Sequence, residues 1–190
     1  AFTLNDLTPF VFSLQPGQRH ALYHGPLKSQ SEHKLADLFE AERQLPLAPL
    51  TAMPDEISVI NVFSLGSAEA VERVSASIAD EPHLVAYSCI AIHEREMGEH
   101  VTKEPALHWI DIHHSLGSKG NGINHLRKEL EIDHVIAFGD GDNDLSMFEC
   151  ASECYAPANA DPVILEAADE IIGHHDEDGV ARFLRKRFEL

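Results

Sequence analysis

The sequence predicts an α/β fold in two parts, and three patterns support this prediction. After about residue 106, short apolar strands alternate with amphipathic helices, as in a parallel sheet with crossover helices. Before that point strands outnumber helices, which is typical of an α+β layer. Residues 135–138 form a continuous apolar run of the kind found in strands buried on both faces. We therefore expect an α+β domain at residues 1–105 and an α/β domain at residues 106–190.

The first part is expected to be rich in strands. Period-two patterns, helical spacing of apolar residues and turn residues give its elements. Pro16 and Gly17 suit the middle of a type II turn between the first two strands. Ser31 is the expected N-cap of the first helix. The expected elements are strands at residues 9–14 and 19–23, a helix at 31–43, a strand at 57–63, a helix at 67–79 and a strand at 83–93.

In the second part strand and helix alternate four times. Ile123, Leu126 and Leu130 are expected to face inward from its first helix. Pro162 is expected at a helix start, where its missing N–H costs nothing. The expected elements are strands at residues 107–112, 135–138, 154–156 and 171–172, and helices at 120–130, 144–148, 162–168 and about 180–188.

Composition excludes several classes of function. The 190 residues carry a formal net charge of −18, so nucleic acids and anionic lipid surfaces would repel the chain. Its apolar runs are too short to cross a bilayer. Cys89, Cys150 and Cys154 form no Cys-x-x-Cys motif, which favours reduced thiols in a cytoplasmic protein. We therefore expect a cytoplasmic globular protein whose partners are neither nucleic acids nor membranes.

The strongest chemical signal is the loop that follows the apolar strand at residues 135–138. Residues 139–144 read Gly-Asp-Gly-Asp-Asn-Asp, and ligands of open α/β sheets bind at the carboxyl ends of strands. Oxygen ligands suit Mg²⁺, which commonly shares phosphate oxygens with its substrate. The same loop could instead simply cap the next helix. It is not an EF-hand loop, because Leu145 and Ala151 occupy the positions of the required Gly and Glu.

A second signal is Lys119, which lies among glycines between an expected strand and the start of a helix. A lysine at a helix N-terminus, with glycines that permit close approach, suits the binding of a phosphate group. Taken alone, a lysine exposed to solvent explains the pattern equally well. Lys119 precedes Asp140 by 21 residues, with one expected helix and one expected strand between them.

Together these two signals resemble the Cof-type branch of the haloacid-dehalogenase-like hydrolases. In that family a Lys-Gly pair at a helix start is followed by a strand and a GDxxNDxxM loop. Here Lys119-Gly120 is followed by GDGDNDLSM at residues 139–147. The resemblance is specific over residues 106–190 and weaker over residues 1–105. It implies a parallel-sheet, Rossmann-like core, of which this chain holds the C-terminal part, with an α+β cap domain at residues 1–105.

The resemblance also implies roles for particular residues. Lys119 would bind the phosphate and, with Asp140, would be catalytic. Asp140 and Asp144 would bind Mg²⁺, the implied cofactor. Asn143 and Asn159 would contact the substrate or support the metal loop. The implied activity is Mg²⁺-dependent hydrolysis of small phosphorylated metabolites, with sugar phosphates as the favoured class.

One departure from the family pattern bears on activity. The nucleophile of the family is the first aspartate of a DxDGT-like segment after a buried strand near the N-terminus, and no such segment precedes the expected cap here. We therefore expect an incomplete chain that is inactive alone, since no aspartyl-phosphate could form. We also expect an exposed sheet edge that favours a homodimer. The alternative is a non-catalytic remnant that binds metal or phosphate, or serves as an interaction module.

Adjacent histidines occur twice, at His113-His114 and at His174-His175. Neighbouring residues on a strand point to opposite faces, so such a pair rarely binds one metal ion. We therefore expect solvated histidines at both places and no zinc site.

Overall fold

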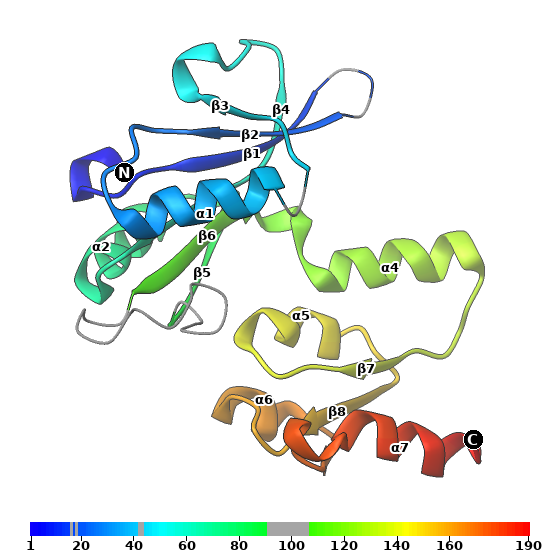
Figure 1. Cartoon of the computed structure of the whole chain (residues 1–190). Helices are drawn as coiled ribbons and strands as arrows, with labels where there is room; N and C mark the ends of the chain where they lie inside the picture. The colour runs from blue at the N-terminus through cyan, green and yellow to red at the C-terminus, as the bar shows by residue number, and fades with distance from the viewer. Residues whose placement is uncertain (16, 18, 42–43, 91–106) are drawn as a thin grey trace. The chain divides into compact units, whose positions relative to one another are not determined.

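The computed structural model describes residues 1–15, 17, 19–41, 44–90 and 107–190. The chain divides into two compact units, Ala1–Ser115 and Leu116–Leu190, which are described separately (Figure 1). Each unit combines strands with helices, so the predicted α/β class is confirmed. Within the described residues, no helix has the length and apolar character needed to span a membrane.

The first unit is built on a six-stranded sheet with the strand order β3-β2-β1-β4-β6-β5. All neighbouring strands are antiparallel except β2 and β3, which are parallel. The two strands predicted at residues 9–14 and 19–23 are confirmed. Pro16, in the expected turn between them, lies outside the described residues. The strands are β1 (Phe10–Gln15), β2 (Arg19–His24), β3 (Leu47–Pro49), β4 (Ser58–Gly66), β5 (Leu84–Ile90) and β6 (His108–His114).

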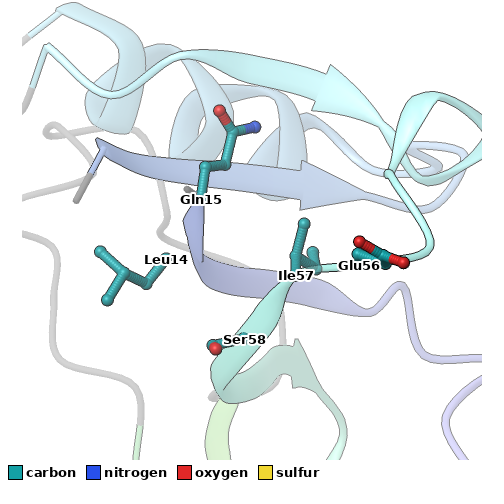
Figure 2. A pocket seen from close by; sticks show the side chains of 5 residues that line it. All are labelled: Leu14, Gln15, Glu56, Ile57 and Ser58. Carbon is teal, nitrogen blue, oxygen red and sulfur yellow. The ribbon is translucent and has the colours of Figure 1, made fainter. Parts of the chain in front are cut away.

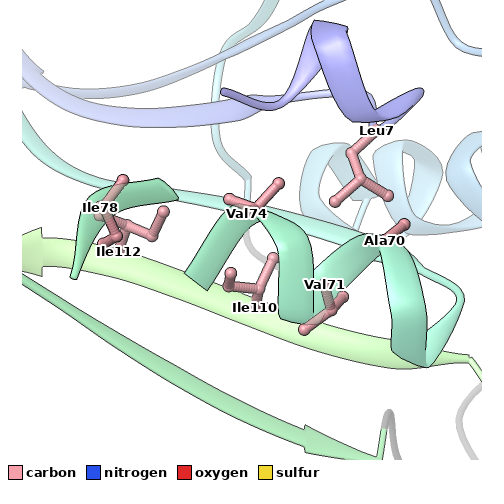
Figure 3. Close-up of a cluster of buried hydrophobic side chains, with 7 residues drawn as sticks. All are labelled: Leu7, Ala70, Val71, Val74, Ile78, Ile110 and Ile112. Atoms are coloured by element: carbon pink, nitrogen blue, oxygen red, sulfur yellow. The ribbon is translucent and has the colours of Figure 1, made fainter. Parts of the chain in front are cut away.

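Helix α2 (Ala68–Ile78) covers one face of this sheet and agrees with its sequence prediction. The Ser67 side chain caps it by accepting a hydrogen bond from the Ala70 N–H at 3.2 Å. Its apolar side chains recur at helical spacing and pack against alternate residues of β6, together with Leu7 (Figure 3). The cluster consists of Leu7, Ala70, Val71, Val74, Ile78, Ile110 and Ile112.

Helix α1 (Gln30–Ala41) packs through Leu35 and Ala36 against a second apolar cluster of the sheet. The prediction that Ser31 caps this helix is wrong. The Glu32 N–H donates to Ser29 Oγ at 3.2 Å, and the Ser29 N–H donates back to Glu32 Oε2 at 2.9 Å. This reciprocal capping box satisfies two otherwise unpaired donors, so the helix begins one residue earlier. The expected end at residues 42–43 lies outside the described residues.

Strand β6 forms as predicted, but it belongs to the first unit and not to the second. The expected domain boundary at residues 105/106 falls in the undescribed stretch, and β6 follows it. Yet β6 pairs antiparallel with both β4 and β5 of the first unit. The compact units accordingly divide after Ser115, because the pairing of a strand depends on distant residues that local sequence patterns do not encode.

The second unit contains the predicted parallel sheet, with the strand order β7-β8-β9. Helix α7 covers one face, where the Phe183 ring lies 4.2 Å from Tyr155 and 5.7 Å from Phe138, centroid to centroid. Phe148 and Ile164 pack on the other face. The elements are α4 (Lys119–Leu130), β7 (Ile136–Phe138), α5 (Leu145–Phe148), β8 (Glu153–Pro157), α6 (Pro162–Ala167), β9 (Glu170–Ile172) and α7 (Gly179–Phe188), with short 3-10 turns η3 (Ser115–Gly117), η4 (Asp142–Asp144) and η5 (His175–Glu177).

The prediction that the apolar side chains of α4 face inward is wrong for two of its three residues. Leu126 is 53% exposed and Leu130 is 63% exposed, whereas Ile123 is partly buried. In the second unit α4 packs mainly against α5 and η4. Periodicity therefore identified the helix correctly, but not how much of its apolar face is covered.

Candidate functional site

The acidic loop folds around one buried carboxylate, that of Asp144. This side chain is 3% exposed and lies at the end of η4, directly after β7. Its Oδ2 accepts hydrogen bonds from the Asp140 N–H at 2.9 Å and from the Gly141 N–H at 3.3 Å. The Asp144 N–H donates to the Gly141 carbonyl at 2.8 Å. Asp144 therefore fixes the backbone of the loop from inside.

Lys119 reaches the same loop from the first residue of α4. Its ammonium forms an ion pair with Asp144 Oδ1 and lies 3.5 Å from Asn143 Oδ1. The Ser118 side chain caps α4 by accepting a hydrogen bond from the Asn121 N–H at 3.2 Å. The Lys119 side chain remains 48% exposed, so the ammonium can also meet a ligand from solvent. A positive side chain at a helix N-terminus favours an anion.

Two glycines make this approach possible. A Cβ on Gly120 would lie 2.1 Å from the Ser146 carbonyl oxygen, and the Gly120 N–H donates to Ser146 Oγ at 3.2 Å. A Cβ on Gly139 would lie 2.6 Å from the Cβ of Asp144. Any larger residue would push α4 away from α5 or distort the loop. The Lys-Gly pair and the first glycine of the loop thus have a steric cause.

Asp140 has a different environment from Asp144, because its side chain is exposed to solvent. Its carbonyl accepts a hydrogen bond from the Asp161 N–H at 2.8 Å, which ties the loop to the start of α6. A Cβ added to Gly141 would lie 3.3 Å from Asn143 Oδ1 and 4.0 Å from Asp161 Oδ2. Oxygen donors therefore surround this part of the loop, and they suit Mg²⁺. Sequence reasoning missed Asp161, although its position before Pro162 marks the beginning of a helix.

Asn159 lies after β8 and is exposed. Its Oδ1 accepts a hydrogen bond from the His175 N–H at 3.1 Å, so the side chain supports the turn η5. The structure therefore brings Lys119, Asn143 and Asp144 into contact and places Asp140 on the same loop. Asn159 instead accepts its hydrogen bond from the turn η5.

The buried thiol of Cys154, in the strand that follows the acidic loop, is poorly suited to act as a nucleophile. Burial raises the pKa of the Cys154 thiol, and the nearby charge of Asp169 raises it further. Its Sγ lies 3.2 Å from the Phe148 carbonyl oxygen, inside the apolar cluster of the second unit. A thiol with a raised pKa is mostly protonated at neutral pH and reacts slowly.

A hollow in the surface of the first unit has no comparable chemistry. It lies between the end of β1 and the start of β4, and its lining contains one carboxyl and one amide side chain (Figure 2). The amide, that of Gln15, already donates to the Tyr23 hydroxyl at 2.5 Å. The residues that line the hollow are Leu14, Gln15, Glu56, Ile57 and Ser58.

The fold of the chain agrees with comparisons to known proteins. The model of the haloacid dehalogenase-like hydrolases matches residues 11–184, and the chain belongs to this family. YxeH of Bacillus subtilis (strain 168), a protein named as a phosphatase on a provisional basis, is 29% identical over 163 residues. The alignment covers 85% of this chain and 55% of YxeH. The 5-amino-6-(5-phospho-D-ribitylamino)uracil phosphatase YitU of the same organism is 36% identical over 85 residues, 44% of this chain and 32% of YitU.

Solved structures show the same fold at low sequence identity. A haloacid dehalogenase-like hydrolase from B. subtilis aligns with a TM-score of 0.68 and 21% identity over 97% of this chain and 66% of its own. The subclass IIB sugar phosphatase BT4131 aligns with a TM-score of 0.65 and 18% identity over 99% of this chain and 63% of its own. This chain thus spans about half to two thirds of the length of YxeH and of these two structures.

Proposed function

We propose that this chain carries the phosphate- and Mg²⁺-binding part of a phosphoric monoester hydrolase for small phosphorylated metabolites, with sugar phosphates as the favoured class. The observation that carries this proposal is the contact of Lys119 with the buried Asp144 carboxylate, beside the exposed Asp140. Membership of the haloacid dehalogenase-like hydrolases supports it. The names of relatives that act as phosphatases support the substrate class.

In this proposal each residue has a separate task. Lys119 binds the phosphoryl oxygens, and Asp144 holds both the lysine and the loop in place. Asp140 and Asp144 hold Mg²⁺, and Asn143 orients the phosphoryl group. Bound Mg²⁺ would supply charge neutralisation on the phosphoryl oxygens. Asn159 contacts the substrate through its side-chain amide, whose Oδ1 also accepts a hydrogen bond from the His175 N–H.

We further propose that the strand-rich first part serves as a cap that sets substrate specificity, and that the residues after it provide the C-terminal part of the core. The antiparallel pairing of β6 with β4 and β5 favours extending the cap as far as Ser115. A cytoplasmic location remains our prediction from cysteine usage.

We propose that the 190 residues alone bind phosphate and Mg²⁺ without catalysing hydrolysis. An aspartyl-phosphate requires a carboxylate that can attack in line with the leaving group. Asp144 is unsuited to this because its oxygens already face the loop amides and Lys119. Asp140 is assigned to the metal.

Two measurements on the 190-residue chain test these proposals. Isothermal titration with inorganic phosphate in the presence of Mg²⁺ should show binding that Lys119→Ala weakens by about tenfold or more, since a hydrogen bond to a charged group contributes about 1.5–3 kcal/mol. Lys128→Ala, on the same helix, is the matched control and should bind normally. Absence of phosphate binding by the unchanged chain would refute the site.

The second measurement is the hydrolysis of p-nitrophenyl phosphate with Mg²⁺. We expect no turnover above the background rate. Steady turnover that Asp140→Ala abolishes would show that the chain alone is active. That result would contradict the proposed inactivity but not the proposed phosphate site.

We also propose that the chain forms a homodimer through β7. Among the described residues, β7 pairs only with β8, so its other edge presents unpaired backbone groups. The exposed Leu126 and Leu130 on α4 add apolar surface in the same unit.

A further inference from the structure

We propose that the turn formed by His174, His175 and Asp176 binds a transition-metal dication of the Zn²⁺ class, at a site separate from the acidic loop. One potential ligand atom from each of these residues lies within 4.8 Å of the other two. Two imidazoles and a carboxylate form a donor set that suits zinc. The site does not depend on the function proposed above.

Two of the distances between donor atoms are close to those that zinc requires. His174 Nδ1 lies 3.6 Å from Asp176 Oδ2, and His175 Nε2 lies 3.4 Å from Asp176 Oδ1. Ligands at about 2.0–2.1 Å in a tetrahedral arrangement are separated by roughly 3.3 Å. The carboxylate therefore already lies at nearly the right distance from each imidazole.

The two histidines of this pair lie in a turn, where neighbouring side chains need not point to opposite faces. His174 and His175 do not lie on a strand. His174 is the N-cap of η5 and His175 is the first residue of that turn, and their ring centroids lie 4.6 Å apart. The expectation that both histidine pairs point to opposite faces therefore fails here, because a turn does not have the two-residue repeat of a strand.

His113 and His114 provide an internal contrast, because they do lie on strand β6. The ring of His113 stacks with Tyr87, whereas the ring of His114 stacks with His83. Each imidazole of this pair therefore has a different neighbour, as expected for residues on opposite faces of a strand. The pair His113-His114 is therefore a matched control for the pair His174-His175.

The backbone of the turn is held firmly before any ion binds. The His174 carbonyl accepts hydrogen bonds from the N–H groups of Glu177 at 3.0 Å and Gly179 at 3.1 Å. The His175 N–H donates to Asn159 Oδ1 at 3.1 Å. A Cβ on Gly179 would lie 1.8 Å from the Gly173 carbonyl oxygen, so the two ends of the turn pack closely. Such preorganisation reduces the entropy lost on binding.

Charge and donor chemistry favour this class of cation over Mg²⁺. Glu177 and Asp178 add two carboxylates next to Asp176. Imidazole nitrogens select zinc, copper or nickel, whereas Mg²⁺ prefers oxygen donors. Binding through His174 Nδ1 would replace its hydrogen bond from the Asp176 N–H, a contact of 3.2 Å. One neutral hydrogen bond is a small loss beside a bond to a metal ion.

The test is a titration of the tag-free 190-residue chain with Zn²⁺, followed by calorimetry and by the imidazole signals in NMR spectra. We expect one Zn²⁺ per chain and shifts confined to the His174 and His175 rings. His175→Gln and Asp176→Asn should each weaken binding by at least about tenfold, since even residues that only support a ligand change affinity by 10–100-fold. His114→Gln should bind as the unchanged chain does, and excess Mg²⁺ should not displace the ion.

Three results would overturn the proposal. The unchanged chain could fail to bind Zn²⁺, or His114→Gln could weaken binding as much as His175→Gln does. Loss of binding in Asp140→Ala but not in His175→Gln would place the ion in the acidic loop instead. Circular dichroism of each variant confirms that it is folded, so a loss of binding reports on the ligands.

Discussion

Replacing Asp144 with alanine should destabilise the second unit by about 3 kcal/mol, because the carboxylate organises the acidic loop. The hydrogen bond from the Asp140 N–H, at 2.9 Å, should contribute about 2 kcal/mol, since a bond to a charged acceptor is worth about 1.5–3 kcal/mol. The bond from Gly141 is longer, at 3.3 Å, and contributes less. Lys119 is 48% exposed, so its ion pair adds at most about 1 kcal/mol.

These magnitudes predict an order among three variants. Asp144→Asn keeps one oxygen for the loop amides but loses the charge, so it should cost about half as much as Asp144→Ala. Lys119→Met removes only the solvent-screened ion pair and should cost about 1 kcal/mol or less. The hydrogen bonds from the loop amides to Asp144 should therefore contribute most to stability, and the ion pair with Lys119 should contribute less.

Urea denaturation followed by circular dichroism measures the overall loss, and hydrogen exchange locates it. Trp109, the single tryptophan, lies in the first unit, so its fluorescence reports that unit. The amides of α4 and α5 should lose protection in Asp144→Ala, whereas Asp142→Ala, which alters an exposed carboxylate of the same loop, should leave them protected. If Lys119→Met costs as much as Asp144→Ala, the ion pair dominates and the reasoning is wrong.

Three further predictions concern titratable groups and association. Burial raises the pKa of Asp111, and the hydrogen bond from Asn61 at 2.6 Å opposes this shift. The contribution of Asp111 to stability is therefore present below about pH 4, and it is lost as the pH rises through the folded-state pKa. Asp111→Asn would give Asn61 Oδ1, which lacks a partner among the described residues, an N–H donor; it should stabilise the fold by about 1 kcal/mol at pH 7 and by less at pH 3.5, and equal thermal shifts at both pH values would contradict this. The Tyr155 hydroxyl, then His134 and Arg187, lower the pKa of Glu153, so its contribution is present above its unfolded pKa and lost as the pH falls through the folded one; Glu153→Gln should lower the melting temperature at pH 7 more than in acid. Sedimentation at rising protein concentration should show a dimer that Leu126→Lys with Leu130→Lys weakens, and a monomer at every concentration would exclude the association through β7.

Local patterns predicted most elements because local physics determines them. In α2 the apolar residues at helical spacing lie within one stretch of chain, and the predicted helix was confirmed. The cap of α1 was misplaced, because Ser29 and Ser31 both suit an N-cap and only the position of Glu32, three residues after Ser29, distinguishes them. The short strand β3 was missed, because its three residues lie in a proline-rich stretch and pair with a strand that is distant in sequence.

Tertiary pairing explains the larger differences. Nothing in residues 107–112 states which sheet they join, and β6 joins the first unit through long-range pairs such as Phe63 with Asp111. The exposure of Leu126 depends likewise on what packs beside α4, which the helix itself does not encode. For the site, the spacing of Lys119 and the loop predicted residues that do come together. The hydrogen bond from Asp161 could not be read from that spacing.

The acidic loop shows why a run of similar side chains need not share one role. Asp144 is buried and accepts hydrogen bonds from the chain itself, so its charge is largely compensated before any ligand arrives. Asp140 and Asp142 are exposed, so their charge remains directed at solvent and at a cation. If Mg²⁺ binds as proposed, it must share Asp144 with Lys119 and two amides, whereas Asp140 has no such competition within the contacts described. Asp140→Asn should therefore weaken Mg²⁺ binding while leaving stability nearly unchanged, and Asp144→Asn should weaken both. Equal loss of stability in the two variants would mean that the loop depends on both carboxylates alike.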